Sequence, residues 1–366
     1  MNKIAIVGGG PSGIFCALNI ISEFKKVAFK DFSIDIFDKG QVLRTLLVTG
    51  NGRCNITNAI SDTKEFSSNY PRGEKFLYSI FSRYFTFETL DFFKSLGVST
   101  YVQEDNRIFP VSNSAKDVKD KMLFNLLKSK KVKFLNKKIN SALDLKAYDK
   151  IIVSAGSRGT TSLIKSFNHN CVEFKKALCG LKVENNFSKP FPKGVSVKAL
   201  DGDFIFTDFG ISGPLAFKIS SINAYKDFPY EIEIKLFNSD ELFELINLNP
   251  KKSIGNLVSR FIPKSLAKVI VKNYDKNSCE ISKNEIESYS ILKLKIVDTA
   301  PVGEIVNAGG VDLKEIDKNC KSKKFENLWF CGEILNIDGF CGGFNLQNCW
   351  STGFIVAKDV VSSIIE

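Results

Sequence analysis

Three glycines near the start of the sequence, Gly8, Gly10 and Gly13, have the spacing G-x-G-x-x-G. Between a strand and a helix, Gly8 permits the tight turn, Gly10 lets the backbone approach a pyrophosphate, and Gly13 lets the helix pack closely on the strand. The phosphates would then face the helix N-terminus, where free N–H groups and the helix dipole favour negative charge. The pattern indicates a dinucleotide site that also includes Pro11 and Ser12.

An acidic residue follows at a suitable distance. The second expected strand, residues 33–37, ends at Asp38, close to the spacing of about 20 residues for an acid that binds a ribose hydroxyl. Asp38 favours an unphosphorylated ribose, as in FAD or NAD, over NADP. Lys39 and Arg44 follow it as further candidates. The alternative is a glycine turn without a ligand, but strand, turn, helix, strand and acid occur in the required order.

The loop after Arg44 contains the run GNGRCNITN at residues 50–58. Loops beyond the second strand lie where a dinucleotide binds in such sheets. Arg53 could face a phosphate, and Asn55 or Asn58 could bond a ring or a ribityl chain, although an ordinary surface loop would look similar. The candidate cofactor-binding residues of this loop are Gly52, Arg53, Cys54 and Asn55.

A second glycine loop, residues 338–345, precedes a helix expected from about Leu346 to Ile365. If a flavin is bound, the N–H groups of this helix would face the pyrimidine edge of the ring, where negative charge gathers on reduction. The alternative is another strand–helix unit without a ligand. The candidates in and just before this loop are Gly332, Glu333, Gly342, Gly343, Phe344 and Asn345. A further candidate, Gly156, lies in the glycine turn after residues 150–153.

The elements that must position these residues change in type along the chain. The first part alternates expected strands and helices, with a helical, amphipathic segment over about residues 70–96, as a doubly wound parallel sheet does. Residues 171–235 contain short alternating segments between turns, which predict a small antiparallel β domain. Residues 239–290 are helical and lysine-rich, and α/β texture returns near the C-terminus.

Composition excludes several kinds of site. The nine cysteines form no C-x-x-C pair and no Cys/His cluster, so we expect no disulfide scaffold and no metal site, but reduced thiols in a cytoplasm. His169 is the only histidine, which argues against a Ser-His-Asp triad. No apolar run reaches spanning length, and the N-terminus lacks the features of a signal peptide. We therefore expect a cytoplasmic protein without a membrane segment.

The net charge of +11 has two interpretations. In the first interpretation, the charge comes from solvated lysines in a lysine-rich background. An anionic macromolecular partner, such as RNA, is the other.

Six stretches resemble one family, the BaiN/YhiN-like (RdsA-like) bacterial NAD(P)/FAD-dependent oxidoreductases. They follow the family's order over nearly the whole chain: residues 8–13, 50–58, 107–110, 207–214, 307–317 and 330–347. The resemblance implies an α/β, two-lobed flavoprotein with a Rossmann-like FAD domain, a β-barrel-like domain and a helical insertion. The corresponding boundaries are 1–165 and 307–366 for the FAD domain, 166–238 plus 291–306 for the β-barrel-like domain, and 239–290 for the insertion.

The resemblance also implies a chemistry. Noncovalent FAD would take hydride from NADH or NADPH, bound transiently, and reduce an activated C=C bond. Members are linked to uridine in ribosomal RNA, giving dihydrouridine, or to small unsaturated molecules such as bile-acid intermediates. An rRNA substrate, a small enone substrate, and a non-catalytic flavoprotein that binds RNA or protein all stay open.

Two residues are candidates for the catalytic acid. Cys341 lies beside the expected flavin ring, and a thiol near a helix N-terminus can have a lowered pKa, which suits proton transfer near neutral pH. The alternative is that Cys341 merely fills a tight glycine loop. Asp208 stands in the run TDFGISGP where the family usually has His. If that His acts in family catalysis, this chain must use another group.

Overall fold

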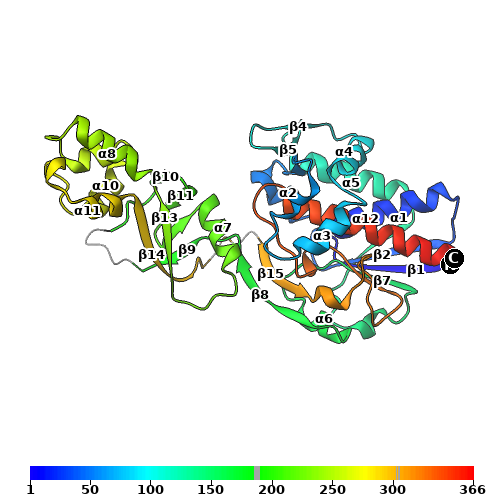
Figure 1. Cartoon of the computed structure of the whole chain (residues 1–366). Helices are drawn as coiled ribbons and strands as arrows, with labels where there is room; N and C mark the ends of the chain where they lie inside the picture. The colour runs from blue at the N-terminus through cyan, green and yellow to red at the C-terminus, as the bar shows by residue number, and fades with distance from the viewer. Residues whose placement is uncertain (185–189, 302, 304–305) are drawn as a thin grey trace. The chain divides into compact units, whose positions relative to one another are not determined.

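The computed structural model describes residues 1–184, 190–301, 303 and 306–366. The chain forms two compact units (Figure 1): the first unit comprises Met1–Phe174 and Asn307–Glu366, and the second comprises Lys175–Val306. The division falls after the predicted boundary at residue 165, within β8 (Cys171–Ala177), which forms a two-stranded sheet with β15 (Val306–Val311).

A five-stranded parallel sheet forms the centre of the first unit, with the order β16-β7-β1-β2-β6. Its strands come from both parts of the chain: β1 (Asn2–Val7), β2 (Phe32–Asp38), β6 (Val132–Asn136), β7 (Lys150–Val153) and β16 (Leu328–Phe330). This is the predicted Rossmann-like arrangement. Strand order reverses around β1, and ligands of such sheets bind beyond the carboxyl ends of the strands at that point.

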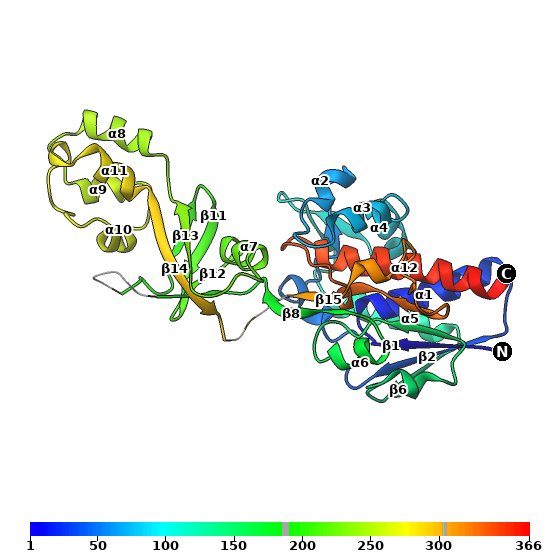
Figure 2. The same cartoon turned by 60° about the horizontal axis from the view of Figure 1, so that its bottom comes forward.

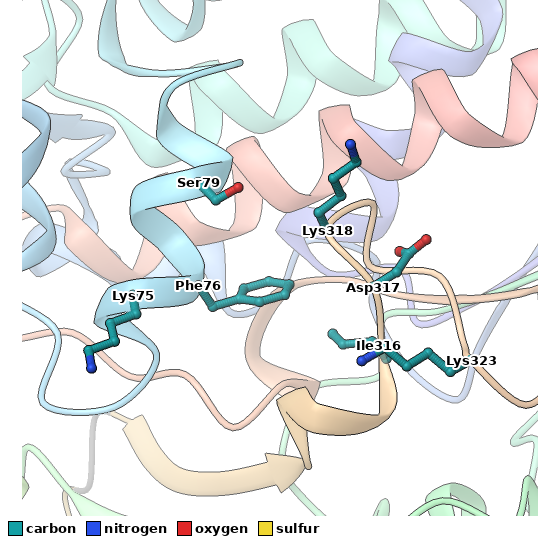
Figure 3. A pocket seen from close by; sticks show the side chains of 7 residues that line it. All are labelled: Lys75, Phe76, Ser79, Ile316, Asp317, Lys318 and Lys323. Atoms are coloured by element: carbon teal, nitrogen blue, oxygen red, sulfur yellow. The ribbon is translucent and has the colours of Figure 1, made fainter.

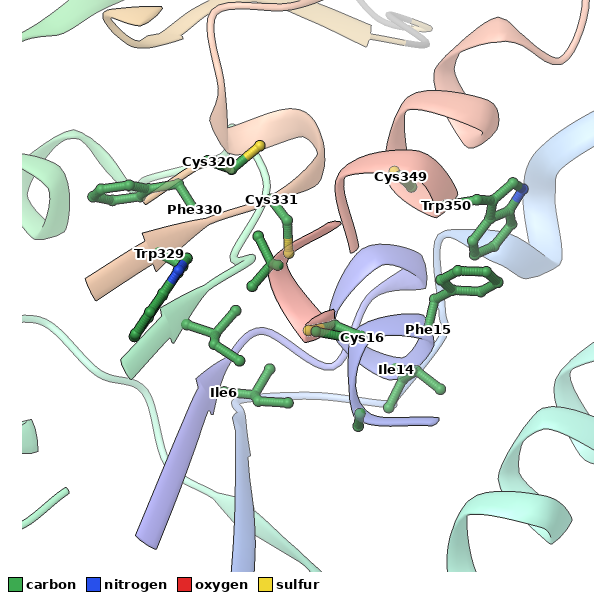
Figure 4. Close-up of a cluster of buried hydrophobic side chains, with 14 of the residues drawn as sticks. Ile6, Ile14, Phe15, Cys16, Cys320, Trp329, Phe330, Cys331, Cys349 and Trp350 are labelled. Atoms are coloured by element: carbon green, nitrogen blue, oxygen red, sulfur yellow. The ribbon is translucent and has the colours of Figure 1, made fainter. Parts of the chain in front are cut away.

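Two long helices lie side by side on this sheet, α1 (Pro11–Lys26) and α12 (Phe344–Ile365), in both Figure 1 and Figure 2. Close approach requires Gly353, since a Cβ there would lie 3.0 Å from the carbonyl oxygen of Ser12. Buried aromatic rings and thiols fill the space around them (Figure 4), with the Phe15 and Trp350 rings 5.1 Å apart. The core therefore fixes the two helix N-termini relative to each other.

The segment over residues 70–96, expected to be helical, forms two helices, α3 (Glu74–Phe81) and α4 (Thr86–Ser95). The Glu88 carboxylate accepts the backbone N–H of Phe85 at 2.9 Å, which starts a new helix. The other elements of this unit are α2 (Thr63–Ser67), α5 (Ala115–Lys128), α6 (Thr161–Ser166) and a three-stranded antiparallel sheet of β3 (Thr57–Asn58), β5 (Arg107–Pro110) and β4 (Thr100–Val102).

The second unit has a six-stranded sheet of order β10-β11-β12-β9-β14-β13 and its own hydrophobic core. The Leu200 N–H donates to the Lys235 carbonyl at 2.9 Å, so the β10–β11 turn meets the opposite edge strand and the sheet curls toward a barrel. Its strands are β9 (Leu181–Val183), β10 (Ser196–Ala199), β11 (Gly202–Phe206), β12 (Gly210–Ser212), β13 (Tyr230–Lys235) and β14 (Ile291–Thr299).

Helix α7 (Pro214–Ile222) follows β12 in this unit. A helical segment lies between β13 and β14 in the chain. Its helices are α8 (Ser239–Leu248), α9 (Ile254–Val258), α10 (Lys264–Ile270) and α11 (Lys283–Tyr289). Across the described residues of both units, no helix combines the length and apolar character needed to cross a membrane.

Candidate functional site

The glycine loop between β1 and α1 has a different constraint at each glycine. Gly8 has φ +112°, and a Cβ there would lie 2.4 Å from the carbonyl oxygen of Ser154. A Cβ on Gly13 would lie 2.1 Å from the carbonyl oxygen of Gly8. A Cβ on Gly10 would meet no atom within 4 Å. The loop is therefore packed at its two ends and open at Gly10, beside the N-terminus of α1.

Asp38 ends β2 next to this loop. Its Oδ2 accepts the N–H of Gly9 and its Oδ1 accepts the N–H of Gly40, both at 2.8 Å. A carboxylate has about four acceptor sites, so these two bonds orient the side chain and leave capacity for ribose hydroxyls. Lys39 and Arg44 are exposed on the segment that follows.

Ser12 lies in the first turn of α1, after Pro11, and its side chain is buried. Its hydroxyl donates to the carbonyl of Cys331 at 3.4 Å, and a Cβ on Gly332 would lie 2.3 Å from Ser12 Oγ. The Ser12 side chain therefore contacts the segment after β16, and its backbone N–H is the group that could face a ligand.

The run at residues 50–58 and the C-terminal glycine loop bind each other. Asn58 Nδ2 donates to the Gly342 carbonyl at 3.0 Å, and the Asn55 side-chain oxygen accepts the Gly343 N–H at 2.9 Å in the amide orientation that satisfies both groups. Gly343 has φ +96°, and a Cβ there would lie 2.4 Å from the Thr57 carbonyl oxygen. Two stretches far apart in sequence thus form one wall at the start of α12.

A buried chain of polar side chains supports this wall, and sequence reasoning missed it. The Thr57 hydroxyl donates to Gln347 Oε1 at 2.6 Å, and Gln347 Nε2 donates to Thr89 and Ser351 hydroxyls at 2.9 Å each. The signal in the sequence was Gln347, a polar residue in the second turn of an apolar helix. Full pairing makes such a network rigid.

The loop over residues 338–345 is held by its own polar side chains and by Tyr70 and Arg72. Asn345 Oδ1 accepts the Gly339 N–H at 2.9 Å, and its Nδ2 donates to the Gly339 carbonyl at 2.7 Å. Arg72 forms an ion pair with Asp338, which is fully buried. Tyr70 donates its hydroxyl to the Phe344 carbonyl at 2.6 Å. The predicted cofactor residue Asn345 therefore uses its side chain to shape the loop.

Arg53 and Cys54 differ in exposure although they are neighbours. The Arg53 guanidinium lies 4.2 Å from the centre of the Phe109 ring and is partly exposed. Cys54 is fully buried with φ +67°, and burial raises the pKa of its thiol to about 12. The Cys54 side chain therefore faces the core, whereas Gly52 is exposed and Arg53 is partly exposed.

Glu333 follows Gly332 immediately after β16. Part of its side chain reaches solvent, yet desolvation raises the pKa of the carboxyl to about 7, with Arg158 opposing and Asp338 adding to the shift. At neutral pH this carboxyl can donate or accept a hydrogen bond. Gly156 lies in the loop after β7 with φ +68°, and a Cβ there would meet no atom within 4 Å.

The two catalytic candidates lie in different units. Cys341 belongs to the first unit and is exposed, but desolvation by the surrounding loop raises the pKa of its thiol to about 11 despite the opposing effect of Arg107. The expected lowering of this pKa is therefore wrong. Asp208 belongs to the second unit, where its exposed carboxylate pairs with Lys193 Nζ at 2.6 Å. All the predicted cofactor-binding residues lie in the first unit.

No group of three or more His, Cys, Asp or Glu side chains within the described ranges could hold a metal ion.

A family model and three curated relatives match nearly the whole chain. A family model described as the HI0933-like protein Rossmann domain matches residues 2–359. The chain is 28% identical to a 3-dehydro-bile acid delta(4,6)-reductase of Clostridium scindens, with 98% of each protein covered. It is 24% and 22% identical to ribosomal RNA dihydrouridine synthases of Haemophilus influenzae and Escherichia coli, with coverage of 97% and 98% of each chain, respectively.

Proposed function

Because the chain belongs to the HI0933-like Rossmann family of oxidoreductases, we propose that it is a reductase that binds FAD noncovalently. The proposed donor is NADH or NADPH, and the proposed acceptor is an activated carbon–carbon double bond. The observation that carries the proposal is the open space at Gly10, at the N-terminus of α1 and next to the oriented carboxylate of Asp38. A pyrophosphate and a ribose require these two features together.

The residues of the first unit fit FAD. Backbone N–H groups at the start of α1 would hold the pyrophosphate, Asp38 a ribose hydroxyl, and Glu333 a hydroxyl of the ribityl chain. The N-terminus of α12, held by the loop pairing at Gly343, would face the ring with its positive dipole end. When bound, FAD supplies a ring that accepts hydride from a nicotinamide and passes hydride to an acceptor.

Reduction of a C=C bond also requires a proton, and Cys341 is the proposed donor. Its raised pKa, about 11, keeps a proton on Sγ at neutral pH, so the thiol acts as an acid without prior protonation. The nearby Arg107 guanidinium favours the thiolate that remains after transfer. Asp208 pairs with Lys193 and is the second choice.

For the substrate we propose uridine in ribosomal RNA, reduced to dihydrouridine. The names of two relatives and the net charge of +11 support an RNA substrate. A small enone is the second candidate, because the relative with 28% identity is named a bile-acid reductase.

Two measurements test the proposal. Anaerobic mixing of the yellow protein with NADH or NADPH should bleach the flavin absorbance. If neither nucleotide bleaches it while dithionite does, the donor is wrong. Mass spectrometry of ribosomal RNA from a deletion strain should show less dihydrouridine than the parent strain. An unchanged dihydrouridine content would reject RNA as the substrate and favour the small enone.

A further inference from the structure

A hollow of about 550 Å³ lies in the first unit between α3 and the loop over residues 316–323. Its lining includes Phe76 and Ser79 from the helix and Ile316 from the loop, with Lys75, Lys318 and Lys323 around it. Figure 3 shows the Phe76 ring projecting from α3 toward the loop. None of these residues belongs to the proposed FAD site.

The hollow combines an apolar surface with an excess of positive charge, three lysines against one aspartate. Phe76 is partly exposed whereas Ile316 is buried, so the Phe76 ring provides the accessible apolar surface. All three lysines are exposed, and within the described residues none of them forms an ion pair. Lys323 Nζ donates to the Lys314 carbonyl at 2.9 Å, which leaves two of its three N–H groups for a ligand.

The one acidic residue in the lining, Asp317, is engaged by its own loop. Its Oδ1 accepts the N–H groups of Asn319 and Lys321 at 2.8 and 2.9 Å. Arg83 fixes the loop by donating to the Lys318 carbonyl and to Asn319 Oδ1. These hydrogen bonds set the geometry of the loop. Of the three lysine side chains in the lining, only Lys323 contributes a hydrogen bond to it in the part of the chain that the structure describes.

We propose that this hollow binds one nucleotide of single-stranded RNA, with the base on Phe76 and the phosphate at Lys318 and Lys323. Single-stranded nucleic acid is bound where basic side chains follow the backbone and aromatic rings stack on bases. The volume suits one nucleotide, since pockets for small organic ligands span about 300–1,000 Å³. The inference rests on the proposed RNA substrate. The nucleotide bound in the hollow is not the uridine that is reduced, but a neighbouring one that holds the RNA on the protein.

The test uses the FAD-loaded protein, a fluorescent ten-nucleotide oligouridylate and fluorescence anisotropy without a hydride donor. The double variant Lys318→Glu/Lys323→Glu reverses the charge at both proposed phosphate contacts, and we expect RNA binding at least tenfold weaker with a smaller salt dependence. Phe76→Leu keeps apolar packing but removes the ring, and we expect binding about fivefold weaker or more. Flavin content and thermal unfolding confirm that the variants fold.

The matched control is Lys133→Glu/Lys138→Glu, which makes the same charge change at exposed lysines outside the hollow. The proposal is overturned if both double variants weaken binding equally, because diffuse charge would then explain the affinity. It is also overturned if oligoglutamate or pyrophosphate competes as well as RNA, or if the wild-type protein does not bind the RNA.

These outcomes are separate from failure of the proposed function. Flavin bleaching by NADH or NADPH tests the reductase without RNA, and the lining variants should leave it unchanged. A protein that bleaches with a nucleotide but binds no RNA would remain a reductase and would lack this RNA contact.

Discussion

Gly10 and Gly13 are two residues of one motif with opposite structural demands. Space at Gly10 is open, whereas a Cβ at Gly13 would enter the backbone of Gly8. Substitutions at the two positions therefore separate ligand binding from folding.

We predict that Gly10→Val loses FAD but keeps its fold. The added side chain would occupy the proposed pyrophosphate position, while the stability of the cofactor-free protein should change by no more than about 1 kcal/mol. Gly13→Ala should instead lower the stability of the cofactor-free protein by about 1–3 kcal/mol or more through overpacking. Flavin absorbance and urea unfolding measure the two effects. Retention of FAD by Gly10→Val would contradict the proposed site.

Cys341→Ser tests the proposed proton donor. We expect normal FAD binding and normal reduction of the flavin by the nucleotide, but reoxidation by substrate slowed on the order of 10²- to 10⁴-fold. Because the acid form is required, wild-type reoxidation should slow as the pH rises toward the thiol pKa of about 11. Stopped-flow absorbance measures both, with Cys279→Ser, at an exposed cysteine of the second unit, as the control. Equal rates for the Cys341 variant and the wild type would leave Cys341 as a small loop residue.

At the scale of elements, His169 joins the start of β8 to the turn before β16. Its Nδ1 lies 2.7 Å from the Phe167 carbonyl oxygen and its Nε2 lies 3.0 Å from the Ser322 hydroxyl. Ser322 Oγ already accepts the N–H groups of Lys324 and Phe325 at 3.0 Å each, so it is suited to donate its proton to a neutral imidazole. Burial lowers the pKa of His169, while the Phe167 carbonyl and Glu315 oppose this and Lys324 adds to it.

We predict that the contribution of His169 to the free energy of unfolding decreases in mild acid. Since the folded-state pKa of His169 lies below 6.5, the unfolded chain takes up the proton first as the pH falls. The stabilisation is complete above pH 6.5 and declines as the pH falls toward the folded-state pKa. His169→Gln should be less stable than the wild type at pH 7.5 by about 1–2 kcal/mol, with a smaller difference at pH 5.5.

Urea unfolding of both proteins at the two pH values measures this difference. Comparing wild type with variant cancels the opposite contribution of Glu333, whose raised pKa favours the folded state as the pH falls. A difference that does not change with pH would show that His169 carries no proton-linked stability.

At the scale of the whole molecule, the two units have separate hydrophobic cores that share no residue. Every predicted cofactor-binding residue lies in the first unit. Ligand binding to one unit should therefore stabilise that unit directly.

Removal of FAD should lower the melting temperature of the first unit. FAD at 100 times its Kd contributes about 2.7 kcal/mol, which corresponds to a shift of about 5–10 °C for a unit of this size. Differential scanning calorimetry of protein with and without FAD, combined with proteolysis to assign each transition, measures the shift. A shift confined to the second unit would refute the assignment of the site.

The spacing of Gly8, Gly10 and Gly13, with Asp38 at the end of the next strand, was sufficient to predict the Rossmann-like unit. These features depend on local geometry, which neighbouring residues determine. The family was predicted correctly for a similar reason, because its motifs are contiguous runs.

Tertiary structure alone decided which side chains face the site. Cys54 and Ser12 lie in the predicted runs but point into the core, and Asn345 closes its own loop. The pairing of Asn55 with Gly343, the Thr57–Gln347 bond and the raised pKa of Cys341 all depend on segments hundreds of residues apart or on burial. Desolvation and long-range hydrogen bonds arise only when the chain packs, so spacing in the sequence does not encode them.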